Sequence, residues 1–529
     1  MIKTEVCIVG CGPIGLSSAI LLARQGIQVL LVERRGELNT HPRSRFVDVG
    51  TMELMRYFGI EKQVEATGLG PDWTAFNRWS PALTSDDCVS IASPSFHSVP
   101  NTISPCLPVM TCQDHVENAL LKVVHAEANI DCRFNTEARD IKQDDTHVSL
   151  TIADLVNGDE KQVDAAYLIG ADGPHSRTRA LIGSELETDP LQMYSQDVIF
   201  DGDLSKHVGD RKGSLLYSAG PSGVTIFQPL DGVRRWRVQI FKPHEEDLSE
   251  AEITERVSAA IGDTDIQLDI KSVGHWQPTP GCTTKFREGR IFLAGDAAHI
   301  SLPTGGMGNN IGFAGARNLA WKLAYVLRGK ADDSILDSYE AEMMPAAQKR
   351  IAHGVSITEG MRGLIFAIIA GEDVADGAHA TRFYADYDNI ILGHEYASGL
   401  VMAESTEPPV GDSEISDFIP CVRSGRRAPH VWLNTEKTFS VCDWFGTTHV
   451  LLAGVGVTHQ PWQNAVDQFA HDYPLVYRAM PQHDAQGIYA DDELVLVRPD
   501  GVIADHWRAG DFDDEAAVKR LTNSLIKQL

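Results

Sequence analysis

The chain has 529 residues, 43% of them hydrophobic and 22% charged, and its formal net charge is −27. This length is too great for one hydrophobic core and indicates two to four domains of an ordinary globular enzyme. The acidic balance argues against nucleic acid and against an anionic membrane surface as partners, because both would repel it.

Cysteine usage and apolar runs indicate the compartment. Nine cysteines are present, with no CxxC pair and no Cys/His spacing typical of a metal site. We therefore expect reduced, mostly buried thiols and no bound metal. No apolar run is long enough to span a membrane, and the first residues lack a basic leader and a small-residue cleavage site. These features predict a cytoplasmic protein.

The first predicted unit is a strand, a glycine turn, a helix, a second strand and an acid. An apolar strand at 5–9 leads into the turn Gly10-Cys11-Gly12-Pro13-Ile14-Gly15. A helix over 17–25 and a strand over 28–32 follow, and Glu33 comes 18 residues after Gly15. This order is typical of a dinucleotide-binding βαβ unit.

Each part of this unit has a physical role. Gly10 permits the tight turn, Gly12 lets the backbone approach a pyrophosphate, and Gly15 lets helix and strand pack closely. The helix N-terminus, opened by Pro13, offers N–H groups to the phosphates. Glu33 would bind ribose hydroxyls, and its charge disfavours the 2′-phosphate of NADP at this site.

Two further glycine motifs lie later in the chain. A strand over 163–169 ends in the turn Gly170-Ala171-Asp172-Gly173. A strand over 290–295 places Asp296 at its carboxyl end, where open α/β sheets bind ligands. The glycine-rich loop 303–310 follows and opens a second helix, which runs through 318–323.

Between these motifs the pattern changes to that of an antiparallel sheet. The stretch 235–241 alternates apolar and polar residues, so the two faces of its strand differ. Such a sheet would form the substrate cavity. Alternation does not say which face lines it, and plain core packing is the simpler explanation for each candidate ring. The candidates for ring binding are Tyr217, Phe227, Trp236 and Trp276, with Arg237 beside them.

The last part of the chain, 405–529, is a shorter α/β unit. Strands are expected over 448–453 and 493–497, with helices over 463–470 and 514–529. Without a CxxC pair, thiol redox chemistry is not expected there. We expect a structural role or the stabilisation of a homodimer.

Taken together, the three motifs resemble the single-component FAD-dependent aromatic hydroxylases, of the para-hydroxybenzoate hydroxylase and phenol hydroxylase type. The resemblance covers most of the chain. It is supported by the stretches 41–45, 51–54, 337–340 and 427–430, and by Gln113, Glu117 and Leu120.

The resemblance implies an α/β (α+β multi-domain) fold with three parts. A Rossmann-like FAD-binding domain would comprise 1–70, 106–185 and 285–400. An antiparallel-sheet substrate domain, inserted into it, would comprise 71–105 and 186–284. The C-terminal domain, 405–529, would be thioredoxin-like.

The resemblance also implies roles for single residues in binding FAD. Arg34 would lie at the adenine end, Asp296 would bind a ribityl hydroxyl, and Asp172 would serve FAD and NADPH. Backbone N–H groups of the second helix would face the flavin pyrimidine, where the reduced ring is anionic. The cofactor contacts implied are Gly10, Gly12, Pro13, Ile14, Gly15, Glu33, Arg34, Arg43, Gln113, Asp172, Asp296, Gly305, Gly308, Asn309 and Asn310.

Three positions depart from the family pattern. Gly315 stands where an acidic residue is usual, and Met307 and Asn309 replace the commoner Gln and Met of the loop. These changes concern the local contacts of the isoalloxazine and leave the expected fold untouched.

The implied reaction is monooxygenation of a small phenolic or polycyclic aromatic substrate. NADPH or NADH, docking transiently, would reduce FAD, and O2 would add at flavin C4a to give the hydroperoxide that oxygenates the ring. The resemblance implies catalytic roles for two residues. Arg45 would lie near the substrate or the moving flavin, or alternatively bind pyrophosphate. Pro303 would frame the oxygen-bearing edge of the flavin, or simply break the loop.

Three alternatives accompany this reading. Baeyer–Villiger insertion or epoxidation of a polyketide-like substrate would need the same cofactors. A flavin halogenase should carry a Trp-x-Trp-x-Ile-Pro stretch, which the sequence lacks. A non-catalytic FAD- or NAD-binding scaffold would show no substrate-stimulated NAD(P)H oxidation.

Overall fold

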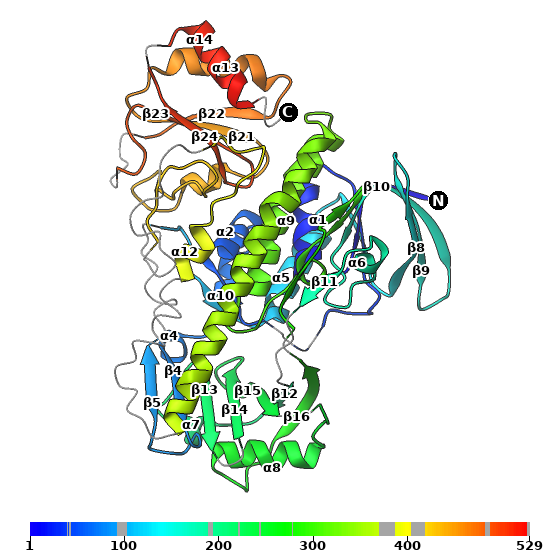
Figure 1. Cartoon of the computed structure of the whole chain (residues 1–529), viewed down its shortest axis with the longest axis vertical. Coiled ribbons are helices and arrows are strands. Elements are labelled where there is room, and N and C mark those ends of the chain that lie inside the picture. The colour runs from blue at the N-terminus through cyan, green and yellow to red at the C-terminus, as the bar shows by residue number, and fades with distance from the viewer. Residues whose placement is uncertain are drawn as a thin grey trace.

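The structure is a computed structural model, and it shows a mixed α/β protein of several parts (Figure 1). It describes residues 1–39, 41, 44–92, 103–188, 194–220, 223–242, 245–277, 279–369, 387–403, 418–481, 487–510 and 512–525. Within these ranges no helix is both long and apolar enough to cross a bilayer.

The first part is built on a mainly parallel sheet. Its strand order is β18-β19-β10-β1-β2-β7, with the hairpin β8–β9 extending from β10. The strands are β1 (Ile2–Val9), β2 (Val29–Val32), β7 (Ile130–Arg133), β8 (Thr136–Gln143), β9 (Val148–Asp154), β10 (Glu160–Gly170), β18 (Arg287–Glu288) and β19 (Ile291–Leu293). The helices of this part are α1 (Pro13–Arg24), α2 (Val49–Phe58), α3 (Glu61–Glu65), α5 (Gln113–Ala126), α6 (Arg177–Leu181), α9 (Met307–Leu327), α10 (Asp337–Ile369) and α12 (Tyr387–Leu392).

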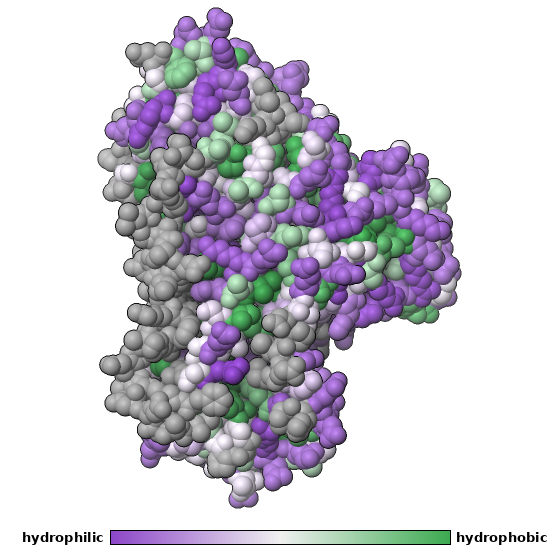
Figure 2. Space-filling view, viewed as in Figure 1, coloured by the Kyte–Doolittle hydropathy of each residue, from purple (hydrophilic) through white to green (hydrophobic). Residues whose placement is uncertain are grey.

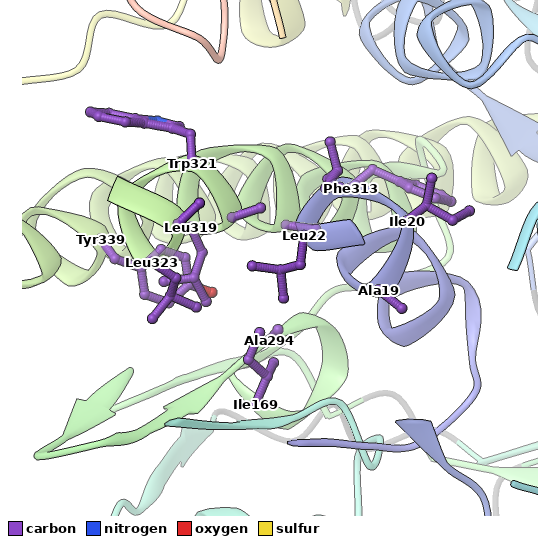
Figure 3. Close-up of a cluster of buried hydrophobic side chains, with 14 of the residues drawn as sticks. Ala19, Ile20, Leu22, Ile169, Ala294, Phe313, Leu319, Trp321, Leu323 and Tyr339 are labelled. Atoms are coloured by element: carbon purple, nitrogen blue, oxygen red, sulfur yellow. The ribbon is translucent and has the colours of Figure 1, made fainter. Parts of the chain in front are cut away.

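The core of this part follows from the sequence pattern. β2 is buried along its whole length, as expected of a strand covered on both faces of a parallel sheet. α1 packs against α9 above the strand ends, so that Leu22 lies over Ala294 and Ile169, whereas Phe313 lies beside Ile20 (Figure 3). α1 ends where Gly26 takes a positive φ of 80°, the conformation that glycine adopts after a helix.

The second part is a seven-stranded sheet in the order β16-β12-β15-β14-β13-β4-β5. Its strands are β4 (Phe76–Ser80), β5 (Val89–Ala92), β12 (Tyr194–Asp201), β13 (Leu215–Gly220), β14 (Gly223–Pro229), β15 (Arg235–Lys242) and β16 (Asp269–Trp276). The expectation of a purely antiparallel sheet is wrong at one pair, since β4 and β13 run parallel. β4 comes from a distant stretch of chain, so no hairpin constrains its direction.

The two faces of this second sheet have different neighbours. One face packs on α8 (Glu250–Ile261), with Val198, Phe227 and Trp236 in a shared apolar cluster. The opposite face turns toward the first part, where Trp79, Tyr217 and Ile226 cluster with Phe46 and Met307. The substrate wall, as we call this second face, is therefore the side on which the two parts meet.

α10 belongs to both parts. Met343 and Ala347 lie in the core beneath the parallel sheet, whereas Ile357 and Met361 pack in the cluster that contains Trp79. Figure 1 shows this long helix descending from the first part alongside the lower sheet.

The C-terminal unit carries a four-stranded sheet in the order β22-β21-β23-β24. β21 and β22 are parallel and joined through α13, whereas β23 and β24 are antiparallel. This arrangement agrees with the expected short α/β unit. Its elements are β21 (His449–Ala453), α13 (His459–Ala470), β22 (Leu475–Ala479), β23 (Glu493–Val497), β24 (Ile503–Arg508) and α14 (Asp514–Leu525).

Short elements complete the chain. They are α4 (Pro71–Thr74), α7 (Ser205–Val208), the strand pair β3 (Phe46–Val47) and β6 (Val109–Met110), the strands β11 (Leu186–Thr188), β17 (Gly281–Thr283) and β20 (His299–Ile300), and the 3-10 turns η2 (Gly295–Ala297), η3 (Asp333–Leu336) and η4 (Val441–Trp444). The face shown in Figure 2 is largely hydrophilic, with hydrophobic residues in small groups, as the acidic composition leads one to expect.

Candidate active site

The first glycine turn, the turn that carries Asp296 and helix α9 meet around one side chain, Ile14 in the first turn of α1. A Cβ built on Gly295 would lie 2.9 Å from Ile14 Cγ1, and one built on Gly312 of α9 would lie 2.7 Å from Ile14 Cδ1. The turn that carries Asp296 and the start of α9 are thus packed directly onto the first glycine turn. Segments almost 300 residues apart in sequence form one site.

The glycine turn has the shape of a phosphate cradle. A Cβ at Gly10 would lie 2.3 Å from the Ala171 carbonyl oxygen, and one at Gly15 would lie 1.9 Å from the Gly10 carbonyl oxygen, so no larger residue fits. A Cβ at Gly12 would meet no atom within 4 Å. The open space stands at the N-terminus of α1, behind Pro13, and it fits the pyrophosphate of FAD.

Glu33 lies where an adenosine ribose would be bound. It is buried, and it accepts hydrogen bonds from the backbone N–H of Cys11 at 2.9 Å and of Arg35 at 3.0 Å. These bonds fix the carboxylate against the glycine turn. Arg34 is exposed beside it, and Arg43 lies outside the described residues.

Gln113 and Asp172 are engaged in holding their own segments. Gln113 exchanges two hydrogen bonds with the Ser44 backbone at 2.9 and 3.1 Å and donates to Glu117 at 2.7 Å. Asp172 accepts from the backbone N–H groups of Arg177 at 2.9 Å and Thr178 at 3.0 Å. Its carboxylate therefore organises the start of α6, and its contacts with FAD and NADPH stay a prediction.

The loop before α9 has the backbone that an anion site needs. Gly305 and Gly306 take positive φ values of 83° and 64°, and the Gly306 N–H donates to the Pro303 carbonyl oxygen at 3.0 Å. A Cβ at Gly306 would lie 2.9 Å from Phe46 Cβ. The first turn of α9, with Gly308 and Asn309, leaves helix N–H groups that can face an anionic flavin edge.

The side chain of Asn310 is structural. Its Oδ1 accepts from the Asp48 N–H at 3.1 Å and the Thr51 hydroxyl at 2.7 Å, and its Nδ2 donates to the carbonyl oxygens of Phe46 at 3.1 Å and Gly306 at 2.7 Å. It therefore ties the start of α9 to the segment around Phe46. A contact of Asn310 with the cofactor can come only from its backbone.

Arg45 bridges the first part and the second sheet. It is buried, and its guanidinium donates to the carbonyl oxygens of Pro229 at 2.8 Å and Ser214 at 2.9 Å. Burial lowers the pKa of Arg45 to about 10, so the group keeps its charge at neutral pH. Within the described part of the chain, no carboxylate lies within ion-pair distance of it.

The substrate wall has an aromatic half and a polar half. Trp79 and Tyr217 stack with their ring centroids 4.8 Å apart and their planes at 6°. On the neighbouring strands, Arg237 pairs with Asp197, and Gln239 Oε1 accepts from Gln228 Nε2 at 2.8 Å. The Trp79 Nε1 and Gln239 Nε2 donors are buried and have no acceptor among the described residues.

Two of the candidate ring-binding residues lie on the face opposite the substrate wall. Phe227 and Trp236 point to α8 and are fully buried in the cluster there, because their positions along β14 and β15 alternate away from the substrate wall. Tyr217 and Arg237 lie on the wall itself. The side chain of Trp276 lies outside what the structure describes.

Sequence reasoning missed a buried ionic network behind the site. Arg498 of the C-terminal unit forms a two-pronged pair with Glu342 of α10 at 2.6 and 2.9 Å. Lys322 of α9 donates to Glu342 at 2.9 Å, and Trp321 Nε1 donates to Asp500 at 3.1 Å. The Lys322, Glu342 and Arg498 side chains are fully buried. The one sequence feature that could have indicated this network is Lys322, a charged residue within an apolar helical stretch.

One group of residues in the described part of the chain has ligand atoms close enough for a metal ion, namely Cys112, Asp114 and His115. Asp114 pairs with Arg235 at 2.7 Å, and His115 Nδ1 is bonded to the Thr111 hydroxyl at 3.1 Å. Asp114 and His115 are thus already paired with protein groups, and neither needs a metal ion as its partner.

Comparisons with known proteins agree with this geometry. Residues 3–353 match the FAD binding domain family, and residues 422–527 match the C-terminal domain of aromatic-ring hydroxylases. The chain is 31% identical to 4-methyl-5-nitrocatechol 5-monooxygenase of Burkholderia sp, over 99% of this chain and 97% of that one. It is 30% identical to aklavinone 12-hydroxylase RdmE of Streptomyces purpurascens, over 97% of each chain.

Solved structures show the same architecture. The flavin-dependent monooxygenase PieE, in complex with FAD and substrate, superposes with a TM-score of 0.88 at 25% identity over 99% of both chains. Aklavinone-11 hydroxylase with FAD and aklavinone gives 0.85 at 29% identity, over 100% of this chain and 99% of that one. The expected fold and cofactor are confirmed, and the chain belongs to the FAD-dependent aromatic-ring hydroxylases, which are flavoprotein monooxygenases.

Proposed function

We propose that this monooxygenase hydroxylates a phenolic or polycyclic aromatic substrate held between the start of α9 and the substrate wall. The position of Arg45 carries the proposal. It follows Ser44, which is bonded to Gln113, and precedes Phe46, which contacts Gly306 at the start of α9. Its guanidinium reaches the second sheet. A buried cation therefore stands between the flavin helix and the aromatic pair on the wall.

The balanced reaction consumes O2, NADPH or NADH, and a proton, and it yields the hydroxylated ring, the oxidised nucleotide and water. FAD, when bound, supplies the activation of O2. The cofactor contacts proposed for the chain are the glycine cradle, Glu33, Asp296 and the first turn of α9. The pyridine nucleotide is proposed to dock transiently.

The roles of the remaining residues follow from their charge and burial. Arg45 would stabilise the negative charge that develops on a phenol oxygen as the ring is oxygenated. The apolar cluster around Trp79 and Tyr217 would hold the ring and exclude water. Pro303, which is exposed at the head of its loop, is proposed to shape the loop beside the flavin.

The wall favours a substrate with oxygen atoms on a flat ring system. The Trp79 and Gln239 donors without acceptors call for carbonyl or hydroxyl oxygens, and the stacked pair offers a flat apolar surface. Relatives are named for nitrocatechol and for aklavinone, so both single-ring and polycyclic substrates enter the proposal.

The test is a panel of phenols and aromatic polyketides, scored for faster NAD(P)H consumption together with a product one oxygen heavier. We expect at least one compound to do both. If compounds accelerate NAD(P)H consumption but yield only hydrogen peroxide, the proposal of hydroxylation at this site is contradicted.

Baeyer–Villiger insertion or epoxidation of a polyketide-like substrate is the second candidate, since the same cofactors and wall would serve it. Product mass cannot separate insertion from hydroxylation, and product NMR can. The division into 1–70, 106–185 and 285–400, 71–105 and 186–284, and 405–529 also stays a proposal, as does a homodimer.

A further inference from the structure

A pair of thiols lies beside the adenosine end of the FAD site. Cys11 sits within the glycine turn, and its Sγ lies 3.9 Å from the Sγ of Cys132 on β7. The two residues are 121 positions apart in sequence, so only the fold brings them together. Neither of these two cysteines is in a disulfide.

The geometry allows this pair to close. A disulfide requires a sulfur separation of about 2.05 Å, so the two atoms must approach by about 1.9 Å. Gly10 and Gly15 hold the turn rigidly, since neither tolerates a Cβ. β7 is the last strand of its sheet, bonded to β2 alone, so Cys132 is the partner that can move.

The two thiols differ in access and in acidity. Cys132 is half-buried, whereas Cys11 is 2% exposed. The hydrogen bond between the two thiols lowers the pKa of Cys132 and, together with burial, raises that of Cys11. Cys132 is therefore the thiol that an oxidant reaches first, and Cys11 is the thiol that then attacks the oxidised Cys132.

We propose that Cys11 and Cys132 form a reversible disulfide under hydrogen peroxide, and that this oxidised form binds FAD more weakly. The Cys132 sulfur attacks peroxide, the O–O bond breaks, and water leaves once a proton is taken up. The Cys11 sulfur then attacks the Cys132 sulfenic acid, the S–S bond forms, and a second water leaves. Two thiols are oxidised and one peroxide is reduced to two waters.

The link to FAD passes through Glu33. Its carboxylate is held by the backbone N–H of Cys11 at 2.9 Å. The Glu33 N–H also donates to the carbonyl oxygen of Arg133, next to Cys132, at 2.9 Å. Drawing Cys132 toward the rigid turn therefore shifts this bond and displaces the acid proposed to hold the ribose. The expected effect is about a tenfold rise in the FAD dissociation constant, comparable to losing one hydrogen bond to a charged group.

The experiment treats the FAD-loaded protein with excess hydrogen peroxide. We expect an intact mass lower by two hydrogen atoms, a linked peptide containing Cys11 and Cys132 on non-reducing digestion, and release of flavin through a membrane filter. Dithiothreitol should reverse all three changes.

Variants separate this disulfide from general oxidation. Cys132→Ser should give no linked peptide and keep its flavin under peroxide. Cys88→Ser, which removes another half-buried thiol, should behave as the unmodified chain does. Absence of the linked peptide overturns the proposal. Flavin release from Cys132→Ser, or a linked form that retains flavin, overturns the coupling to FAD.

Discussion

Ile14 occupies the space that a side chain at Gly312 would need. The first residues of α1 and α9 can approach because position 312 has no Cβ, and one built there would also lie 3.3 Å from Gly295 Cα. The close contact joins the two helix starts that are proposed to serve the two halves of FAD.

Gly312→Ala should therefore weaken flavin retention and lower the unfolding midpoint, by an amount equivalent to about 1–3 kcal/mol of overpacking. Flavin fluorescence released on heating measures both effects. Gly363→Ala is the matched control, because position 363 is an exposed helical glycine with no atom near its missing Cβ. It should stabilise the chain by up to about 1 kcal/mol. Equal behaviour of the two variants would contradict the packing argument.

Arg498→Met should strongly destabilise the protein, because it removes one of the two ion-pair partners of the buried Glu342. Breaking such a pair costs about 3–5 kcal/mol, seen as a lower midpoint of thermal unfolding. Arg508→Met removes an exposed pair with Asp492 in the same unit and should cost about 0–1 kcal/mol. Similar losses in both variants would show that burial does not set the cost.

Acid should weaken the fold through His299. Burial, assisted by the nearby Arg350, lowers the pKa of His299 from 6.5 to about 4. The unfolded chain then binds more protons than the folded one, so stability is lost as pH falls from about 6.5 to 4, by roughly 3 kcal/mol.

His299→Gln should flatten that decline in unfolding midpoints measured between pH 7 and pH 4. His125→Asn, at an exposed position on α5, should leave the profile unchanged. An unaltered decline in His299→Gln would assign the acid sensitivity elsewhere.

Arg45→Met should retain FAD but lower substrate-stimulated NAD(P)H consumption by about 100-fold, as expected for removal of one charged donor from a transition state. It also leaves the Pro229 and Ser214 carbonyl groups without their donor, so some loss of stability accompanies it. Arg45→Lys keeps the charge and should lose less activity. Full activity in Arg45→Met would exclude a catalytic role.

Local patterns predicted the cofactor unit well and the substrate wall poorly. Each element from β1 to Glu33 is encoded by residues close together in sequence: an apolar strand, a glycine turn and an acid at a fixed spacing. Phe227 and Trp236 were misplaced because apolar residues occupy both faces of a sheet that is covered on both sides, so alternation does not identify the wall.

Long-range contacts left no comparable trace. Glu342 meets Arg498 across 156 positions, and Cys11 meets Cys132 across 121. Only the tertiary fold decides such pairs. A lone lysine at 322 indicated that some acid must lie near it, but not which one.

Met343 of α10 packs in one core and Ile357 of the same helix packs in the other. Opening the two parts as rigid bodies would therefore pull one end of α10 out of its core. A substrate must therefore reach the wall through rearrangement of loops or movement of the flavin itself. α10 therefore holds the two parts as one rigid frame, so access to the active site does not depend on a hinge between them.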